Sequence, residues 1–326
     1  MILVSAAEPS GDRLAADLVS ALGVPARGLA GPAMRAAGVE AIGHAEELGL
    51  MGLFEVVEAL PRAWRLHRDL VQALDGCRLL VVVDAPDFNI PLARAAKKRG
   101  VPVLFYVSPQ VWAWRAGRAR TIAELAEKVI CLLPFEPALY PDGKAVFLGS
   151  PVAERCPRLG EASSNAWCLA PGSRQQEVER LLPVMLQASE GHERLLAAAP
   201  GLDLNADVQR VEGLSEAARR CPVALVASGT ATLELACMGR PMVVVYRVGA
   251  LTYSVAKALV DVPFIALPNL IMGRQVVPEF VQQLDPEVLR RELEAAEGGQ
   301  DLEEVRNALW PEGAGERIAD LVRGYL

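Results

Sequence analysis

The sequence predicts an α/β protein with two doubly wound domains, each a parallel β-sheet covered by helices. Short runs of Val, Ile and Leu alternate with helical patterns along the chain, and unbroken apolar runs are typical of strands buried on both faces of a sheet. Two such series are separated by the polar segment 149–166, which contains Pro, Gly and Ser. The chain of 326 residues is also long enough for two domains of about 150 residues each.

The first series predicts a domain over 1–155, and the second predicts a domain over 156–326. The second domain is expected to end in a charged helical tail from Pro286 onward. The expected strands of the first domain are 1–6, 78–85, 101–108 and 129–134, with helices over 11–22, 89–100 and 115–128. Those of the second are 167–170, 222–228 and 241–247, with helices over 229–239 and 251–260.

Composition and charge exclude several classes of protein. The formal net charge of -7 and the pI near 5.2 disfavour a general nucleic-acid binder. The six cysteines show no C-x-x-C spacing and the three histidines no metal-binding spacing, so we expect free thiols, a reducing compartment and no metal site. No apolar run reaches the roughly 18 residues of a membrane-spanning helix. The start MILVSA lacks a basic region and is interpreted as a strand, not a signal peptide.

Polar loops follow three strands of the first domain. Residues 7–12, AEPSGD, open a helix without a G-x-G-x-x-G dinucleotide motif, and an ordinary helix cap is the alternative to a binding role. In DAPDFN, residues 84–89, we interpret Asp84 as bracing the loop and Asp87 as a base for a sugar hydroxyl, with a turn role as the alternative. The loop 106–120 carries tryptophans and arginines that suit a sugar face, apolar chains or a phosphate, unless it simply packs.

Two loops of the second domain are suited to an anion. In PGSR, residues 171–174, free backbone N–H groups and the Arg174 guanidinium come together at a helix start. Ser228, Gly229 and Thr230 open another helix, and Glu234 one turn later is suited to a ribose diol, with a plain capped helix as the alternative. Asn269, Arg274 and Gln275 follow a further apolar run. Because ligands of doubly wound sheets bind at the carboxyl ends of strands, we expect a nucleotide diphosphate in the crevice between the domains.

Together these loops resemble those of the lipid-A-disaccharide synthases, glycosyltransferases of the GT-B architecture, in which two Rossmann-like domains face a cleft. The resemblance runs in order from Ser5 to Arg274. It rests on the segments SAAEPSGD, LGLMGLFEVVEALPR, DAPDFN, YVSPQVWAWR, LPFEP, PGSRQQEV, ASGTATLE and LPNLIMGR.

The resemblance implies a metal-independent, cofactor-free reaction that inverts the anomeric centre. UDP-2,3-diacylglucosamine and 2,3-diacylglucosamine 1-phosphate would give the β-1,6-linked disaccharide of lipid A and UDP, at the cytoplasmic face of the inner membrane. It also implies an anionic membrane surface as a partner and leaves a homodimer open. The first domain would bind the acceptor and the second the UDP-sugar.

The resemblance also assigns roles to individual residues. The catalytic pair would be Asp87 and Arg174. The substrate-binding set would be Glu8, Ser10, Gly11, Asp12, Asn89, Ser108, Trp112, Trp114 and Arg115. The nucleotide-binding set would be Gly172, Ser173, Ser228, Gly229, Thr230, Glu234, Asn269, Arg274 and Gln275.

The chain departs from the family pattern at three places. Ser150 stands where the family has a histidine, and Ala7 and Pro9 stand where Gly and Ala are usual. The segment between 186 and 223 is short, so we expect a strand and a helix of the second domain to be missing or curtailed. Two other functions therefore stay open: another GT-B enzyme acting on UDP-N-acetylglucosamine, such as a peptidoglycan N-acetylglucosaminyltransferase or a 2-epimerase, and a non-catalytic lipid- or nucleotide-binding homologue.

The segment 50–70 is the predicted membrane-docking surface. It combines apolar residues with arginines, as an interfacial helix does. The alternative is that the same apolar residues pack on the sheet. The residues concerned are Leu50, Met51, Leu53, Phe54, Val57, Trp64, Arg62, Arg65 and Arg68.

Overall fold

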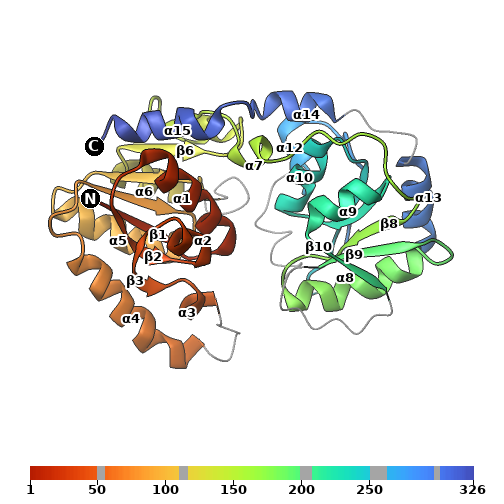
Figure 1. Cartoon of the computed structure of the whole chain (residues 1–326), viewed down its shortest axis with the longest axis horizontal. Helices are drawn as coiled ribbons and strands as arrows, with labels where there is room; N and C mark the ends of the chain where they lie inside the picture. Colours follow the sequence, from red (N-terminus) through yellow and green to blue (C-terminus); the bar gives the residue numbers. More distant parts are fainter. Residues whose placement is uncertain (50–55, 110–116, 199–207, 250–262, 297–301) are drawn as a thin grey trace. The chain divides into compact units, whose positions relative to one another are not determined.

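The chain folds into two compact units (Figure 1). The structure is a computed structural model and describes residues 1–49, 56–109, 117–198, 208–249, 263–296 and 302–326. One unit comprises Met1–Pro151 with Glu312–Leu326, and the other comprises Val152–Pro311. Each unit is built around its own parallel sheet, which confirms the predicted α/β class.

The sheet of the first unit has seven strands in the order β3-β2-β1-β4-β5-β6-β7. All neighbouring strands pair in parallel. Their bounds are β1 Ile2–Ala6, β2 Ala26–Ala30, β3 Glu40–His44, β4 Leu79–Val83, β5 Val103–Tyr106, β6 Lys128–Cys131 and β7 Ala145–Phe147. Helices cover this sheet on both faces. They are α1 Pro9–Leu22, α2 Pro32–Ala36, α3 Glu46–Gly49, α4 Val56–Gln72, α5 Pro86–Lys98, α6 Gly117–Leu125, the 3₁₀ turn η1 Glu136–Leu139, and α15 Ala314–Arg323.

Alternation along the strands gives the first sheet two apolar faces. Leu80 and Val82 of β4 join Leu66 and Leu70 of α4 in one continuous core with α5 and α6. Val81, which lies between Leu80 and Val82 on β4, is also fully buried. Its side chain points to the opposite face of the sheet, which α1 covers. A sheet buried on both faces explains why its central strands β4 and β5 are unbroken apolar runs.

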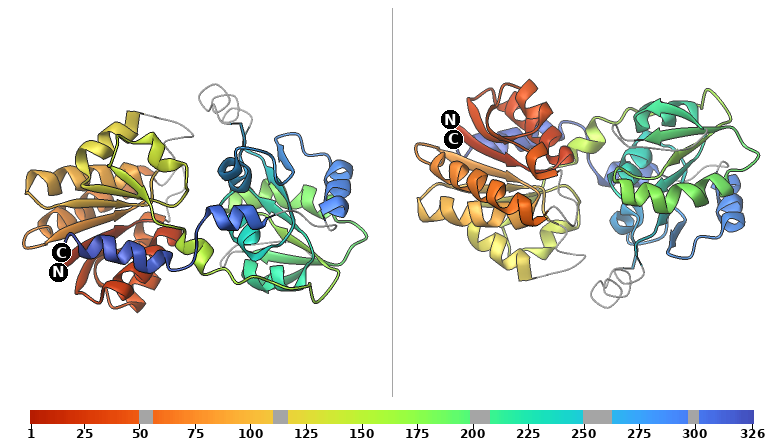
Figure 2. Two further views of the ribbon diagram at one scale, coloured as in Figure 1. Left: turned by 90° about the horizontal axis from the view of Figure 1, so that it is seen from above. Right: turned by 90° about the horizontal axis from the view of Figure 1, so that it is seen from below.

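The carboxyl-terminal helix α15 packs against α1 and belongs to the first unit (Figure 2). Its buried side chains are Ala314, Ile318, Ala319 and Val322. The Arg323 guanidinium donates a 2.5 Å hydrogen bond to the carbonyl of Ala21 at the end of α1. The sequence predicts that the whole tail belongs to the second domain, and for residues 312–326 this prediction is wrong. An amphipathic helix shows which of its faces is buried, but not which partner covers that face.

The sheet of the second unit has six described strands in the order β10-β9-β8-β11-β12-β13. They are β8 Trp167–Ala170, β9 Arg194–Ala198, β10 Gln209–Glu212, β11 Ala224–Ala227, β12 Met242–Tyr246 and β13 Glu279–Val281. The helices are α8 Gln175–Ala188, α9 Leu214–Arg220, α10 Thr230–Met238, α12 Leu267–Met272, α13 Pro286–Ala296 and α14 Glu303–Ala308, with α7 Pro151–Glu154 at the junction of the units. Two strands, β9 and β10, lie in the short segment 186–223, in which we expect a strand and a helix to be missing or curtailed. The connection over 199–207 lies outside the described residues.

In both sheets, the order in which the chain adds strands reverses at an equivalent pair of neighbouring strands. The chain moves outward from β1 to β2 and β3, and in the opposite direction from β4 to β7; β8 and β11 form the same branch point in the second unit. At such a switch point the connections leave to opposite sides, so the carboxyl ends of the two central strands are left uncovered by crossover helices. The loops at these two switch points are the ones that the sequence singled out.

Candidate functional site

Asp84 lies at the switch point of the first unit, directly after β4. The neighbouring strand β1 ends at Ala6, and Glu8 follows it as the residue before α1. Burial, and to a smaller extent the nearby Glu8 carboxylate, together raise the pKa of Asp84 to about 6. A carboxyl with such a pKa is ionised at neutral pH and accepts a proton readily, which is the property of a general base.

The backbone is strained at the same edge of the sheet. Asp84 and Ala85 have φ angles of 49° and 43°, and Val107, directly after the neighbouring strand β5, has a φ of 75°. Left-handed backbone is uncommon for residues other than glycine, and it is least favourable for a β-branched residue such as valine. Strain of this kind is concentrated at functional sites, where the surrounding structure enforces it.

Asp87, the predicted base, lies in the first turn of α5. Its side chain is 82% exposed and forms an ion pair with Arg118 of α6. The ion pair ties this carboxylate to α6, away from the carboxyl end of β4. Asp84, for which the sequence predicts only a loop-bracing role, is the carboxyl of this motif that is largely buried and has a raised pKa.

Two residues predicted to bind substrate bind the protein backbone instead. Asp12 is 3% exposed, and its carboxylate accepts hydrogen bonds from the N–H groups of Gly31 (2.8 Å), Ala33 (2.8 Å) and Met34 (3.2 Å) at the start of α2. Asn89 is fully buried. Its amide N–H donates to the carbonyls of Val83 and Asp84, and its oxygen accepts a 2.7 Å bond from the Ser5 hydroxyl. We therefore assign both side chains to holding the loops in shape.

The other predicted residues of the first unit have different surroundings. Glu8 and Ser10 are exposed at the start of α1, whereas Gly11 is buried against Val83. Ser108 is 3% exposed and its hydroxyl lies 2.9 Å from that of Tyr140, so it anchors the loop after β5. The predicted residues Trp112, Trp114 and Arg115 lie outside the described residues.

The switch point of the second unit begins with the turn Pro171–Arg174, between β8 and α8. Gly172 has a φ of 111°, which brings the turn around to the helix start. Arg174 is the N-cap residue of α8, and its side chain is 75% exposed. The first N–H groups of a helix lack partners within the helix, so this guanidinium and the backbone of α8 together form a surface that attracts anions.

The second loop of this switch point follows β11, the neighbour of β8 in the sheet. The Ser228 hydroxyl donates a 2.8 Å bond to the carbonyl of Ile265, so this hydroxyl is engaged by the protein. Gly229 is the N-cap residue of α10. Thr230 is exposed in the first turn, and Glu234 is half-buried one turn later. The helix start and these two side chains remain the features suited to phosphate and ribose.

The loop after α12 is organised by Asn269, which is fully buried. Its oxygen accepts bonds from the N–H groups of Val276 (2.7 Å) and Val277 (2.9 Å), and its amide donates a 3.0 Å bond to Glu279. Asn269 is thus a loop brace and not an open ligand-binding group. Arg274 is exposed and paired with Glu304 of α14, and Gln275 is exposed.

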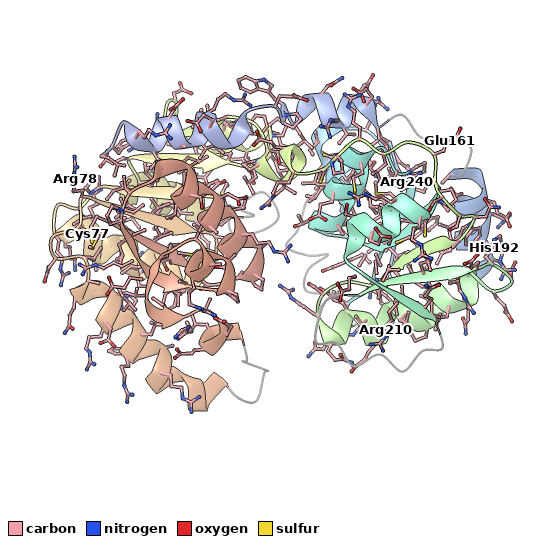
Figure 3. All side chains as sticks on the ribbon, in the orientation of Figure 1. Cys77, Arg78, Glu161, His192, Arg210 and Arg240 are labelled. Atoms are coloured by element: carbon pink, nitrogen blue, oxygen red, sulfur yellow. The ribbon has the colours of Figure 1, made fainter. Side chains whose placement is uncertain are left out.

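Two of the three histidines make ring contacts with aromatic side chains. His192 (labelled in Figure 3) lies in the loop before β9. Its ring stacks on that of Trp167, with ring centroids 3.7 Å apart. Trp167 begins β8, so this pair lies at the opposite end of the strand from Pro171. His67 of α4 contacts Phe88 edge-on. Within the described ranges, no three His, Cys, Asp or Glu side chains form a group that could hold a metal ion.

Comparison of the sequence with known proteins identifies its relatives. The family described as lipid-A-disaccharide synthetase matches residues 2–202 and 192–305. A lipid-A-disaccharide synthase of Anaeromyxobacter dehalogenans is 40% identical over 376 aligned positions, covering 100% of this chain and 97% of the relative. One of Neisseria gonorrhoeae is 37% identical over 338 positions, covering 90% of this chain and 86% of the relative.

Solved structures with the same fold include several enzymes that act on sugars. The calicheamicin glycosyltransferase CalG4 superposes with a TM-score of 0.66 at 16% identity, covering 100% of this chain and 98% of CalG4. The UDP-GlcNAc 2-epimerase of Methanocaldococcus jannaschii superposes with a TM-score of 0.64 at 9% identity, covering 99% and 98%. At these identities the likeness shows the fold alone, which is the predicted GT-B architecture.

Asp84→Asn is expected to stabilise the protein at pH 8. There the carboxyl is ionised in both states, and only the folded state carries the cost of burying the charge. A folded pKa of about 6 against an ordinary value of 3.8 sets an upper limit of about 3 kcal/mol on the gain in the free energy of unfolding. The gain is expected to disappear below about pH 4, where the carboxyl is protonated in both states.

Urea unfolding at pH 8 and pH 4 measures this difference. Asn adopts left-handed backbone readily, so the substitution adds no strain at φ 49°. The matched control is Asp87→Asn, an exposed carboxylate, with an expected change within about 1 kcal/mol. Equal stability of wild type and Asp84→Asn at pH 8 would contradict a buried, charged Asp84.

Proposed function

The chain belongs to the lipid-A-disaccharide synthase family, and from that premise we propose how its residues carry out the reaction. It is a glycosyltransferase that forms the lipid A disaccharide from a nucleotide-sugar and a lipid-linked sugar. We propose UDP-2,3-diacylglucosamine as the donor and 2,3-diacylglucosamine 1-phosphate as the acceptor. The acceptor hydroxyl attacks the anomeric carbon as the bond to the diphosphate breaks, which gives a β-1,6 linkage, inverted configuration and UDP.

The first unit is proposed to bind the acceptor and supply the base. Asp84 takes the proton of the attacking hydroxyl, so that the oxygen gains nucleophilicity as the new bond forms. Its raised pKa and its strained position at the switch point support this assignment. Asp87 is proposed to act through Arg118, with which it is paired, in orienting the acceptor. Glu8 and Ser10, exposed at the start of α1, complete the proposed acceptor surface.

The second unit is proposed to bind UDP without a metal ion. The observation that carries this proposal is the pair of helix starts, at α8 and α10, which follow the adjacent strands β8 and β11 at the switch point. Backbone N–H groups there would hold the diphosphate oxygens, with Ser173 and Thr230 beside them. Arg174 would neutralise the charge that develops on the leaving UDP. Glu234 would accept hydrogen bonds from the ribose.

We propose that the enzyme works on the cytoplasmic face of the inner membrane, since both of its proposed substrates carry acyl chains. None of the helices in the described ranges is long and apolar enough to cross a membrane. In α4, Leu66 and Leu70 are buried in the core, whereas Trp64 is 78% exposed. Exposed arginines flank this indole, namely Arg62, Arg65 and Arg68. Residues 50–55 of the predicted docking segment lie outside the described residues.

The first test of the function is mass spectrometry of the products formed from the two diacylglucosamine substrates. We expect wild type to yield the disaccharide 1-phosphate. Asp84→Asn should lose at least about 100-fold in kcat, because general-base catalysis contributes on that scale, and should still bind UDP. Asp87→Asn should retain more activity than Asp84→Asn. The reverse order of the two variants would return the role of base to Asp87.

A second test concerns Arg174. Arg174→Ala is expected to lower kcat by about 100- to 1,000-fold, the scale of losing one donor that stabilises developing charge. Arg174→Lys should recover only part of the loss, because lysine lacks the planar fork of the guanidinium. Steady-state kinetics with the natural donor measure both. Near-normal turnover of the alanine variant would show that Arg174 does not stabilise the leaving group.

A third test concerns the membrane. Wild type is expected to sediment with anionic liposomes at low salt, and binding should weaken at high salt because the attraction is partly electrostatic. Trp64→Ser with Arg65→Glu should reduce sedimentation while the circular dichroism spectrum is retained. Arg291→Glu on α13 is the control, because it changes the net charge by the same amount as Arg65→Glu at another exposed site. If the double variant binds as well as wild type, α4 is not the docking surface.

A further inference from the structure

A carboxylate of the protein itself lies against the proposed diphosphate loop. Glu177 is the third residue of α8, and its backbone N–H donates a 3.0 Å bond to the carbonyl of Arg174. Its side chain turns back toward the loop. A Cβ atom added to Gly172 would lie only 2.5 Å from Oε2 of Glu177 and 3.2 Å from its Cβ. The carboxylate therefore covers the glycine whose left-handed backbone shapes the turn.

The same carboxylate is paired with the arginine that would receive UDP. Oε1 of Glu177 lies 3.7 Å from Nη1 of Arg174. Burial raises the pKa of Tyr246, at the end of β12; the charge of Glu177 raises it further and that of Arg174 lowers it, so all three side chains lie near one another. An anion bound to this helix start and to Arg174 would meet the negative charge of Glu177 at close range.

The contact between Arg174 and Glu177 is weak enough to exchange. At 3.7 Å it is longer than a hydrogen bond, and the arginine side chain is 75% exposed. Exposed ion pairs of this kind contribute little to stability. A bidentate guanidinium–phosphate contact at a helix start is stronger. Replacing the carboxylate by a diphosphate at Arg174 therefore costs little on the protein side.

We propose that Glu177 is a positioning residue that occupies the diphosphate site in the free enzyme and competes with UDP for Arg174. When the donor binds, its diphosphate displaces the Glu177 carboxylate from Arg174. After transfer of the sugar, the tethered carboxylate returns to Arg174 and favours release of UDP. The proposal rests on the nucleotide site proposed above and adds to it a residue that weakens binding of the leaving group.

The test is isothermal titration of wild type and Glu177→Gln with UDP alone. The glutamine keeps the size of the side chain and removes its charge. Removing one like charge near the ligand should tighten UDP binding about fivefold or more, since two unit charges 4 Å apart repel by about 1 kcal/mol even in water. UDP should also inhibit turnover of the variant more strongly. The difference in affinity between wild type and variant should shrink at high salt.

Glu179→Gln is the matched control. Glu179 lies on the same helix and is exposed, and its carboxylate accepts a 3.1 Å bond from the Gln175 amide. The variant has the same net charge as Glu177→Gln and therefore controls for the change in overall charge. Because the carboxylate that it removes bonds to Gln175, we expect its UDP affinity to stay within about twofold of wild type.

Each outcome decides a different point. If Glu177→Gln stays folded and binds UDP as wild type does, or more weakly, the competition is overturned, and the product assay still decides the proposed function. If wild type does not bind UDP at all, the nucleotide site and this inference both fail.

Discussion

The chemistry of this chain depends on one constraint, the geometry of parallel strand connections. Parallel neighbours must be joined by crossover segments, and these crossovers are right-handed. Where the order of strands reverses, between β1 and β4 and again between β8 and β11, the crossovers lie on opposite faces of the sheet. The carboxyl ends of the central strands are then left open, and the helices that begin there keep unpaired N–H groups. The sheets thus create the binding loops before any particular side chain is considered.

The sequence predicted this framework well because its signals are local. Apolar runs such as 79–83 and 242–246 can be interpreted without knowledge of what lies beside them. The placement of motifs after these runs was predicted for the same reason. The packing of α15 on the first unit was not, because an amphipathic helix that follows two domains gives no indication of which one it covers.

Individual polar residues were harder to interpret, and the reason is again physical. Asp12, Asn89 and Asn269 stand in motifs beside true candidates, yet each bonds to backbone groups of its own unit. Whether a carboxylate or amide is open to a ligand depends on burial by segments distant in the sequence. Asp12, for example, accepts a hydrogen bond from the N–H group of Gly31. The sequence could have pointed to Asp84, since it follows the strand directly, but its left-handed backbone and the nearby charge of Glu8 exist only in the folded chain.

The return of α15 to the first unit has a consequence for how the protein is made. The ribosome completes residues 1–151 long before residues 312–326, so α1 emerges without the helix that covers it. Its apolar surface must stay exposed, or be shielded by a chaperone, until residues 312–326 are synthesised, and exposed apolar surface of this kind favours aggregation. Loss of residues 312–326 would therefore damage the unit built from residues 1–151, the part of these two units that is synthesised first.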